Sequence, residues 1–288
     1  MVGEIEIVHH SNCTHLSTAI DQESPSTNGQ PPEEMFHLFP SKRMASADLS
    51  TALVDQMRTA DVDKPAPSDI ILNWGNKESG TQDESPLPLF TYVNETIFES
   101  PVYAHLINIY NKDMFTPQVC FLFFKLPLLS ITTIFIWELL LLGVKEASDI
   151  SILKTYLFNL WFGVYSRCEG ALGSSGWEHV FSGEWKGNEV DGQHNWVRFY
   201  LLEKAGKINY HGYYSYDGYT WINELKKTGG FLIGTSPAFD FSLLTVCVLV
   251  HPGNNACRFR LDNYSLAVTS YKQHCSSGTC LSTAYPTN

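Results

Sequence analysis

Apolar residues recur with a helical period in the first half of the chain. Leu49, Leu53 and Met57 are spaced four apart within residues 45–62, which predicts a short amphipathic helix. Residues 101–110 predict a second helix, because they open with a proline, and proline is well tolerated in the first helical turn. Residues 1–44 are largely polar, with STNGQPPEE in the middle, and predict a mostly disordered tail.

The pattern becomes clearer from residue 149 onward. An apolar stripe predicts a helix within residues 148–166, and the next helix is predicted at 194–205, with Gly206 just past its end. Another is predicted after Ser236, an N-cap residue followed by proline. Short strands are expected within residues 178–185, 207–216, 231–234 and 258–271. These patterns predict an α+β fold, in which an N-terminal helical part, residues 45–148, packs on a core of short antiparallel sheets and helices, residues 149–288.

Residues 119–144 depart from this pattern because they are rich in Phe, Leu and Ile. The longest uncharged run, from Leu126 to Trp137, has 12 residues and contains Pro127. A membrane-spanning helix needs about 20 apolar residues, so a membrane span is not favoured. A buried segment, a diverged helix and an error in the gene model remain as alternatives.

Charge is distributed unevenly along the chain. The net charge is −11, yet residues 150–288 contain 11 basic and 10 acidic residues, so the acidity belongs to the first half. The second half can therefore accept a phosphate-bearing ligand, although it lacks the broad basic face of a tight nucleic-acid binder. We expect no DNA partner and a monomeric protein.

The seven cysteines form no CxxC pair and no zinc-type spacing. We favour reduced, partly buried thiols; bonds between Cys247 and Cys257 and between Cys275 and Cys280 are the alternative. The first residues have no apolar signal-peptide core, which favours an intracellular protein, while a secreted one remains open if the N-terminus is incomplete.

Two histidines, His179 and His194, each follow a glycine-rich turn, and the acidic residues Glu178 and Glu184 flank the first. His194 begins a predicted helix, where the helix dipole disfavours imidazolium and so favours a general base. A carboxylate in contact with His179 would favour its imidazolium, which can donate a proton. Two histidines with opposite protonation suit cleavage of an RNA phosphodiester by its own 2′-hydroxyl.

Several separate segments of the sequence resemble the EndoU family of uridylate-specific endoribonucleases. The resemblance is dense in GSSGWEHVFSGE, GQHNWVRFYLLEKAGKINYHGY, FLIGTSPAFDFSLLTVCVL and STAYP, and weaker in TADVD, ILNWG, PLFTYV and SPVYAHLINIY. It implies cleavage of single-stranded, U-rich RNA to 2′,3′-cyclic phosphate ends. The implied roles are His194 as general base, His179 as general acid and Lys226 as the cation that stabilises the phosphorane.

The resemblance also implies supporting and substrate-binding residues. Glu178 and Glu184 take the positions of the family's essential acidic residues, and the implied substrate contacts are Tyr271, Thr228, Thr235 and Ser236. Manganese is the implied cofactor, although an isolated carboxylate pair is a weak metal motif, so we predict no particular metal ligands.

This sequence departs from the family where it has Gly229 and Gly230 in place of small hydroxyl residues after the lysine. A non-catalytic RNA-binding protein of the same fold is therefore one alternative. A membrane-associated or secreted interaction protein is the other, suggested by the apolar run and by sequons at Asn12, Asn94 and Asn263.

Overall fold

The computed structural model describes part of the 288-residue chain. The described residues are Leu49, 51–76, 83–111, Leu139, 143–166, 172–186, 189–212, 219–221, 224–226, 230–262 and 264–287, with backbone only at 185–186, 189–190, 219–221 and 224–226. The predicted tail, residues 1–44, lies outside these residues, and so does nearly all of the apolar run at 119–144. No helix of the described part is long and apolar enough to cross a membrane.

The N-terminal half supplies helices and one small sheet. Its elements are α1 (Thr51–Ala60), β1 (Ile70–Leu72), β2 (Phe90–Val93), the 3-10 turn η1 (Glu95–Glu99), α2 (Pro101–Asn111) and the 3-10 turn η3 (Lys145–Ser148). The predicted helices at 45–62 and 101–110 are confirmed as α1 and α2. Leu49, Leu53 and Met57 are all buried, as their spacing predicts.

The second half begins with α4 and a compact turn. Its first elements are α4 (Ile150–Phe162), the π-helical turn η4 (Glu178–Ser182), β3 (Glu184–Lys186) and β4 (Glu189–Asp191). They are followed by α5 (Trp196–Lys204), β5 (Ile208–Tyr210), β6 (Tyr219–Trp221) and β7 (Glu224–Lys226). The chain continues with α6 (Pro237–Val250), β8 (Gly253–Leu261), β9 (Tyr264–Cys275) and β10 (Gly278–Thr287).

The helices of the second half begin where their capping residues predict. The Ser236 side chain accepts a hydrogen bond from the amide of Phe239, and Pro237 opens α6. In the same way Asp149 caps α4 and Asn195 caps α5. Local sequence signals therefore fix where each of these helices starts.

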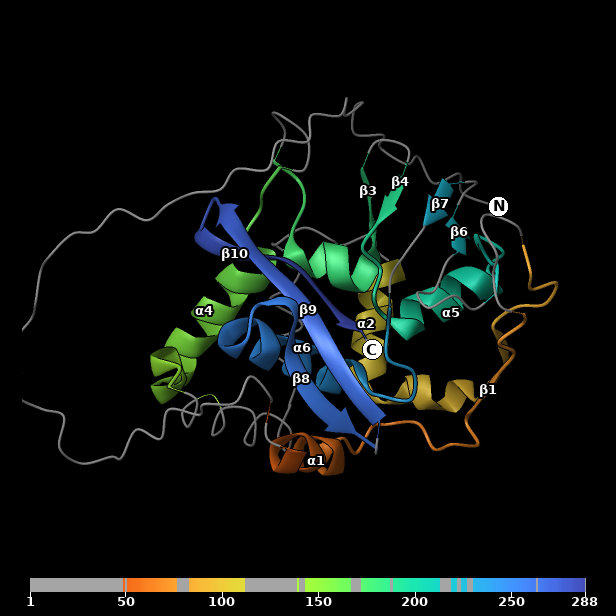
Figure 1. Ribbon diagram of the computed structural model, residues 1–288, viewed down its shortest axis with the longest axis horizontal. Helices are drawn as coiled ribbons and strands as arrows, with labels where there is room; N and C mark the ends of the chain where they lie inside the picture. Colours follow the sequence, from red (N-terminus) through yellow and green to blue (C-terminus); the bar gives the residue numbers. More distant parts are fainter. Residues whose placement is uncertain are drawn as a thin grey trace, which may run out of the picture.

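Four antiparallel sheets are present in the described residues. The largest has the strand order β10–β9–β8 and lies across α6 (Figure 1), while the others pair β1 with β2, β3 with β4, and β5 with β6 and β7. Helices α1 and α2 both contact α6, and α1 also contacts β8, so the N-terminal helices pack on the second half. One buried cluster includes residues from both halves, among them Leu53, Tyr103, Trp161 and Phe241. The predicted α+β fold is confirmed.

Two predicted strands are wrong. Residues 178–182 form a π-helical turn, and only residues 184 and 185 of the predicted segment belong to a strand, β3. A short apolar run fits either structure, and here His179, Val180, Phe181 and Ser182 are buried together, so tertiary packing decides. Residues 231–234 form a loop, because Gly234 has a φ of +84° and turns the chain toward α6.

The expectation of reduced thiols is wrong for four cysteines. Cys247 and Cys257 form a disulfide with an S–S distance of 2.08 Å, which ties the end of α6 to β8. Cys275 and Cys280 form a second disulfide across the turn between β9 and β10. Cysteine is small and often buried, so the sequence pattern is compatible with a free thiol and with a disulfide. The fold brings the two pairs to Cα distances of 5.3 and 6.0 Å, which suit a disulfide bond.

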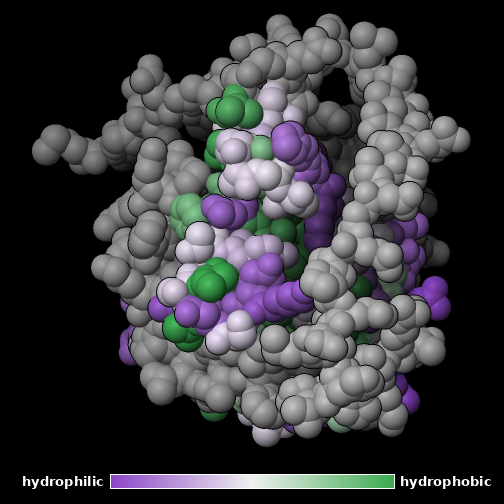
Figure 2. Space-filling view, turned by 90° about the vertical axis from the view of Figure 1, so that its left-hand side faces the viewer, coloured by the Kyte–Doolittle hydropathy of each residue, from purple (hydrophilic) through white to green (hydrophobic). Residues whose placement is uncertain are grey.

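The face seen from the left of Figure 1 lies over α4 and the β9–β10 turn. Figure 2 shows that its described residues are mostly hydrophilic or weakly polar, with separate hydrophobic residues among them. Isolated exposed apolar residues such as Ile152 and Leu172, 53% and 62% exposed, are ordinary on a folded surface.

Candidate active site

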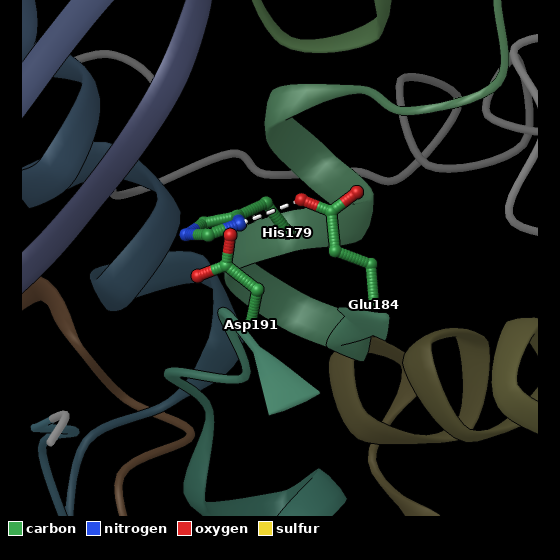
Figure 3. A group of neighbouring side chains, drawn as sticks. All are labelled: His179, Glu184 and Asp191. Carbon is green, nitrogen blue, oxygen red and sulfur yellow. Dashed lines mark hydrogen bonds and ion pairs between the residues drawn. The ribbon is translucent and has the colours of Figure 1, made fainter. Parts of the chain in front are cut away.

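His179 lies in the π-helical turn η4, where it is 4% exposed. Its Nδ1 atom is 2.7 Å from Oε1 of Glu184, the first residue of β3. A negative carboxylate at this distance stabilises the protonated imidazolium. The sequence leaves open which acidic neighbour makes this contact, and the structure identifies Glu184 (Figure 3).

His194 directly precedes Asn195, the N-cap of α5, and is 5% exposed. Its Nδ1 atom is 2.9 Å from the backbone oxygen of Gly230. A carbonyl oxygen can only accept, so Nδ1 donates this hydrogen bond. In the neutral ring the lone pair therefore belongs to Nε2, the atom that a general base needs.

The backbone holds the two histidines together. The amide of Gln193 donates to the carbonyl oxygen of His179, and the amide of His194 donates to that of Val180, both at 2.6 Å. The ring centroids of His179 and His194 are 5.6 Å apart, with 50° between the ring planes. Two imidazoles at this separation can contact one phosphate group from two sides.

Tyr285 stacks on His194, with ring centroids 4.8 Å apart and 18° between the planes. It comes from β10 and so closes the site with the last strand of the sheet. Tyr285 lies in STAYP, one of the segments that resemble the family, but the resemblance implies Tyr271 as the substrate contact, so Tyr285 was not predicted as a site residue. Nothing local could reveal this contact, because 90 positions separate the two rings in sequence.

Lys226 ends β7, which lies beside β4 (Figure 1). Its side chain is outside the described part of the structure, so its role as the phosphorane-stabilising cation remains a prediction. Thr228 lies in a segment that is not described at all. The neighbouring strand β4 ends at Asp191, which belongs to the His179 site.

The other predicted substrate contacts lie in different surroundings. Tyr271 is 46% exposed on β9, opposite Thr283 of β10. Thr235 and Ser236 are buried, and both have partners inside the protein: the Thr235 hydroxyl donates to Asp240, and the Ser236 hydroxyl caps α6. Glu178 is partly buried at the start of η4, and its amide donates to Ser175. A substrate contact from any of these residues remains a prediction.

A group that could hold a metal ion is formed by His179, Glu184 and Asp191. One nitrogen or oxygen atom from each lies within 4.8 Å of the others (Figure 3). The two carboxylates suit Mn²⁺ and the imidazole also suits Zn²⁺ or Fe²⁺, so this donor set can hold the cofactor that the resemblance implies but does not select it. Sequence reasoning missed Asp191, which precedes the Gly192 turn and reaches the site only because β3 and β4 form a hairpin.

Buried polar groups behind the site connect its two halves. The hydroxyl of Tyr110 donates to the carbonyl oxygen of Phe181 at 2.8 Å and to Oδ1 of Asn195 at 3.2 Å. Asn195 in turn donates to Asp240, which also accepts from Thr235 at 2.6 Å. Burial raises the pKa of Asp240 to about 8, although the Thr235 hydrogen bond opposes this shift.

The chain is similar to several known proteins. The family described as Endoribonuclease XendoU matches residues 138–286. The uridylate-specific endoribonuclease of Mus musculus is 36% identical over 247 residues, which cover 73% of this chain and 57% of that protein. Uridylate-specific endoribonuclease D of Xenopus laevis is 34% identical over 250 residues, which cover 76% and 81%.

A solved structure is also similar. It is that of XendoU, described as a splicing-independent snoRNA-processing endoribonuclease, with a TM-score of 0.67 and 27% identity. The match covers 82% of this chain and 96% of that one. The chain spans 57 to 60% of the length of the mouse, human and bovine relatives.

Proposed function

Because this chain belongs to the Endoribonuclease XendoU family, we propose that it cleaves single-stranded, U-rich RNA as an endoribonuclease. The observation that carries the proposal is the pair of histidines with ring centroids 5.6 Å apart. Their surroundings bias them toward opposite roles. Glu184 stabilises a charged His179, and the carbonyl of Gly230 leaves Nε2 of a neutral His194 with its lone pair.

In the proposed reaction, Nε2 of His194 takes the proton of the 2′-hydroxyl, and the 2′-oxygen forms a bond to phosphorus. The bond between phosphorus and the 5′-oxygen breaks as His179 gives that oxygen a proton. The products are a 2′,3′-cyclic phosphate and a 5′-hydroxyl end. Lys226 would stabilise the added negative charge on phosphorus in the transition state.

Manganese has a plausible place in this scheme. His179, Glu184 and Asp191 would hold the ion, which would supply positive charge beside the phosphate. A histidine that binds an ion must be neutral at the nitrogen that binds it, so the charged His179 of the proposed reaction belongs to the ion-free site, where Glu184 orients the ring through its hydrogen bond. A titration of Mn²⁺ followed by electron paramagnetic resonance should show weaker binding to Asp191→Asn than to the wild type. Equal binding by the two proteins would remove Asp191 from the ligand set.

The proposal is tested by incubating oligouridine and mixed-sequence RNA with the protein and analysing the fragment ends. We expect 2′,3′-cyclic phosphates after uridine, and a loss of rate of at least about 10²-fold in His194→Ala. His274→Asn is a matched control, because His274 is exposed on β9 and pairs with Thr279 near the hairpin turn. RNA binding without cleavage by the wild type would contradict the proposal and favour the non-catalytic alternative.

A further inference from the structure

One face of the sheet β8–β9–β10 continues outward from the active site. In antiparallel pairing, residues directly opposite each other project to the same face, and so do residues two apart on one strand. The register pairs Tyr285 with Thr269, Tyr271 with Thr283, and Ala267 with both Thr287 and Arg258. Arg260 pairs with Ser265, one row further along. We call this face the outer sheet face; its members are Arg258, Arg260, Ser265, Ala267, Thr269, Tyr271, Thr283, Tyr285 and Thr287.

The opposite face of the sheet belongs to the core. Cys257, Phe259 and Leu261 alternate with the two arginines along β8 and are 0%, 4% and 7% exposed. Cys257 is bonded to Cys247 of α6, which fixes this side of the sheet against the helix. Arg258 and Arg260 therefore project away from α6, and both are exposed.

Hydrogen bonds across the outer sheet face support the assignment from register. Oδ1 of Asn255 accepts from Thr269 at 3.1 Å and from Thr287 at 2.7 Å. Nε of Arg258 donates to the backbone oxygen of Asn255 at 3.3 Å. Asn255 therefore connects Arg258 to the rows that contain Tyr285, the ring that stacks on His194.

Strand geometry gives the scale of this surface. Rows two residues apart are about 7 Å apart along a strand, and neighbouring strands are separated by about 4.8 Å. Arg258 is therefore roughly 12 Å from Tyr285, and Arg260 lies one row beyond it. Tyr271 lies one row from Tyr285 in the other direction. Asp262, at the end of β8, is already paired with Arg58 of α1 at 2.9 Å.

We propose that the outer sheet face binds the RNA strand beyond the scissile phosphate, with Arg258 and Arg260 on phosphates to one side of Tyr285 and Tyr271 stacked on a base to the other. This inference rests on the proposed function, because it takes the His179–His194 site as the place of cleavage. Guanidinium groups bind phosphate oxygens in pairs of hydrogen bonds, and exposed tyrosines stack on bases without strict sequence preference.

Two features of the outer sheet face favour single-stranded RNA as the molecule that it binds. Its exposed charged side chains on β8 are both cationic, which complements a polyanion. On this face Thr287 and Tyr285 of β10 are partly exposed beside the buried Ala267 and Thr269, so β10 leads from the arginines to the histidine that would act on the 2′-hydroxyl. The net charge of residues 150–288 is weakly positive, and two of its basic residues, Arg258 and Arg260, lie together where they can contact phosphates.

The test compares the double variant Arg258→Gln/Arg260→Gln with the matched control Lys154→Gln/Lys207→Gln. The control removes the same charge from exposed lysines on α4 and after α5. Binding of a non-cleavable 2′-O-methyl oligouridine is measured by fluorescence anisotropy over a range of KCl concentrations. We expect the arginine variant to bind at least about tenfold more weakly, with a salt dependence shallower by about 1.4 in log–log slope, or about 0.7 for each lost phosphate contact. The control should resemble the wild type.

Cleavage assays separate this inference from the proposed function. The arginine variant should have a raised KM for long oligouridine and an unchanged rate on a dinucleoside monophosphate, which is too short to reach the arginines. Binding and salt dependence identical to the wild type would overturn the inference even if cleavage is normal. A wild type that cleaves nothing, together with an arginine variant that loses binding, would overturn the function and keep the binding surface.

Discussion

At the scale of single residues, Gly192 marks the point where two backbone segments meet most closely. It has a φ of +71°, and a Cβ placed on it would overlap the carbonyl oxygen of His179. Gly206 has a similar φ of +66°, but a Cβ there would meet nothing within 4 Å. Substitution of Gly206 therefore introduces backbone strain alone, whereas substitution of Gly192 introduces both backbone strain and steric overlap.

We expect Gly206→Ala to lower the free energy of unfolding by about 1 kcal/mol, the cost of a left-handed backbone for alanine. Gly192→Ala should cost clearly more, because the strain and the overlap add, and should slow RNA cleavage by displacing His179. Urea unfolding and oligouridine cleavage of both variants provide the measurement. Equal stabilities for the two would contradict the close approach at Gly192.

Asp240 is a buried carboxyl group whose titration should affect stability. Its pKa is about 8 in the folded protein because of burial, whereas an unfolded aspartate titrates near 4. Between these values the folded protein keeps a proton that the unfolded chain releases. Stability should therefore be highest at low pH for this group and fall as the pH rises from about 4 to about 8.

Asp240→Asn removes this titration. We expect its free energy of unfolding to depend less on pH across that interval, by up to about 1.4 kcal/mol per pH unit. Urea unfolding of both proteins at several pH values across the interval would measure the difference. Parallel curves for the wild type and the variant would show that Asp240 titrates normally.

At the scale of elements, Tyr110 of α2 joins the turn that contains His179 to the cap of α5. Tyr110→Phe removes the hydrogen bonds to the Phe181 carbonyl and to Asn195, both of which are buried. We expect a loss of about 1–3 kcal/mol in the free energy of unfolding and a lower kcat, because both histidine segments lose a shared support. The control is Tyr156→Phe on α4, where the ring is partly exposed and little change is expected. An unchanged kcat in Tyr110→Phe would show that the backbone bonds alone hold the histidines.

The disulfide between Cys247 and Cys257 joins the end of α6 to β8 over a separation of 10 residues. A cross-link of this length restricts the unfolded chain, so Cys247→Ala/Cys257→Ala should lose about 2–3 kcal/mol of stability. Urea unfolding with and without a reductant would measure it. With the reductant, which also opens the Cys275–Cys280 bond in both proteins, the wild type and the variant should unfold at similar midpoints. Identical midpoints for the two proteins without a reductant would contradict a stabilising Cys247–Cys257 bond.

Elements with their own start signals were predictable from the sequence. Pro101 and the Ser236–Pro237 pair opened helices where their backbone chemistry requires, because capping depends on neighbours only a few positions away. The turn at 178–182 was not predictable, since its four buried residues are arranged by packing from other elements.

His179 and His194 were found as a pair because they lie close in the sequence. Asp191, Tyr285 and the carbonyl of Gly230 reach them only through strand pairing and loop closure.

At the scale of the whole molecule, the described residues of both halves share one large buried cluster. Leu49 and Met57 of the α1 region are in the same buried cluster as Trp161 of α4 and Val268 of β9. The amide of Leu49 also donates to the backbone oxygen of Arg258, so the N-terminal segment supports the strand that contains the proposed phosphate contacts. The proposed cleavage and RNA binding would therefore depend on helices from the first half of the sequence.

The hydrogen bonds from Gln193 and His194 to the η4 carbonyls have a consequence for how such proteins diversify. These bonds join main-chain atoms, so substitutions of exposed side chains on β8 and β9 leave them in place. Arg258, Arg260 and Tyr271, in contrast, are exposed side chains on the sheet. If the chain cleaves RNA as proposed, substitutions at these three positions would change which strands are bound and leave the histidine pair as it is, and a library randomised at the three positions would select nucleases with altered preference.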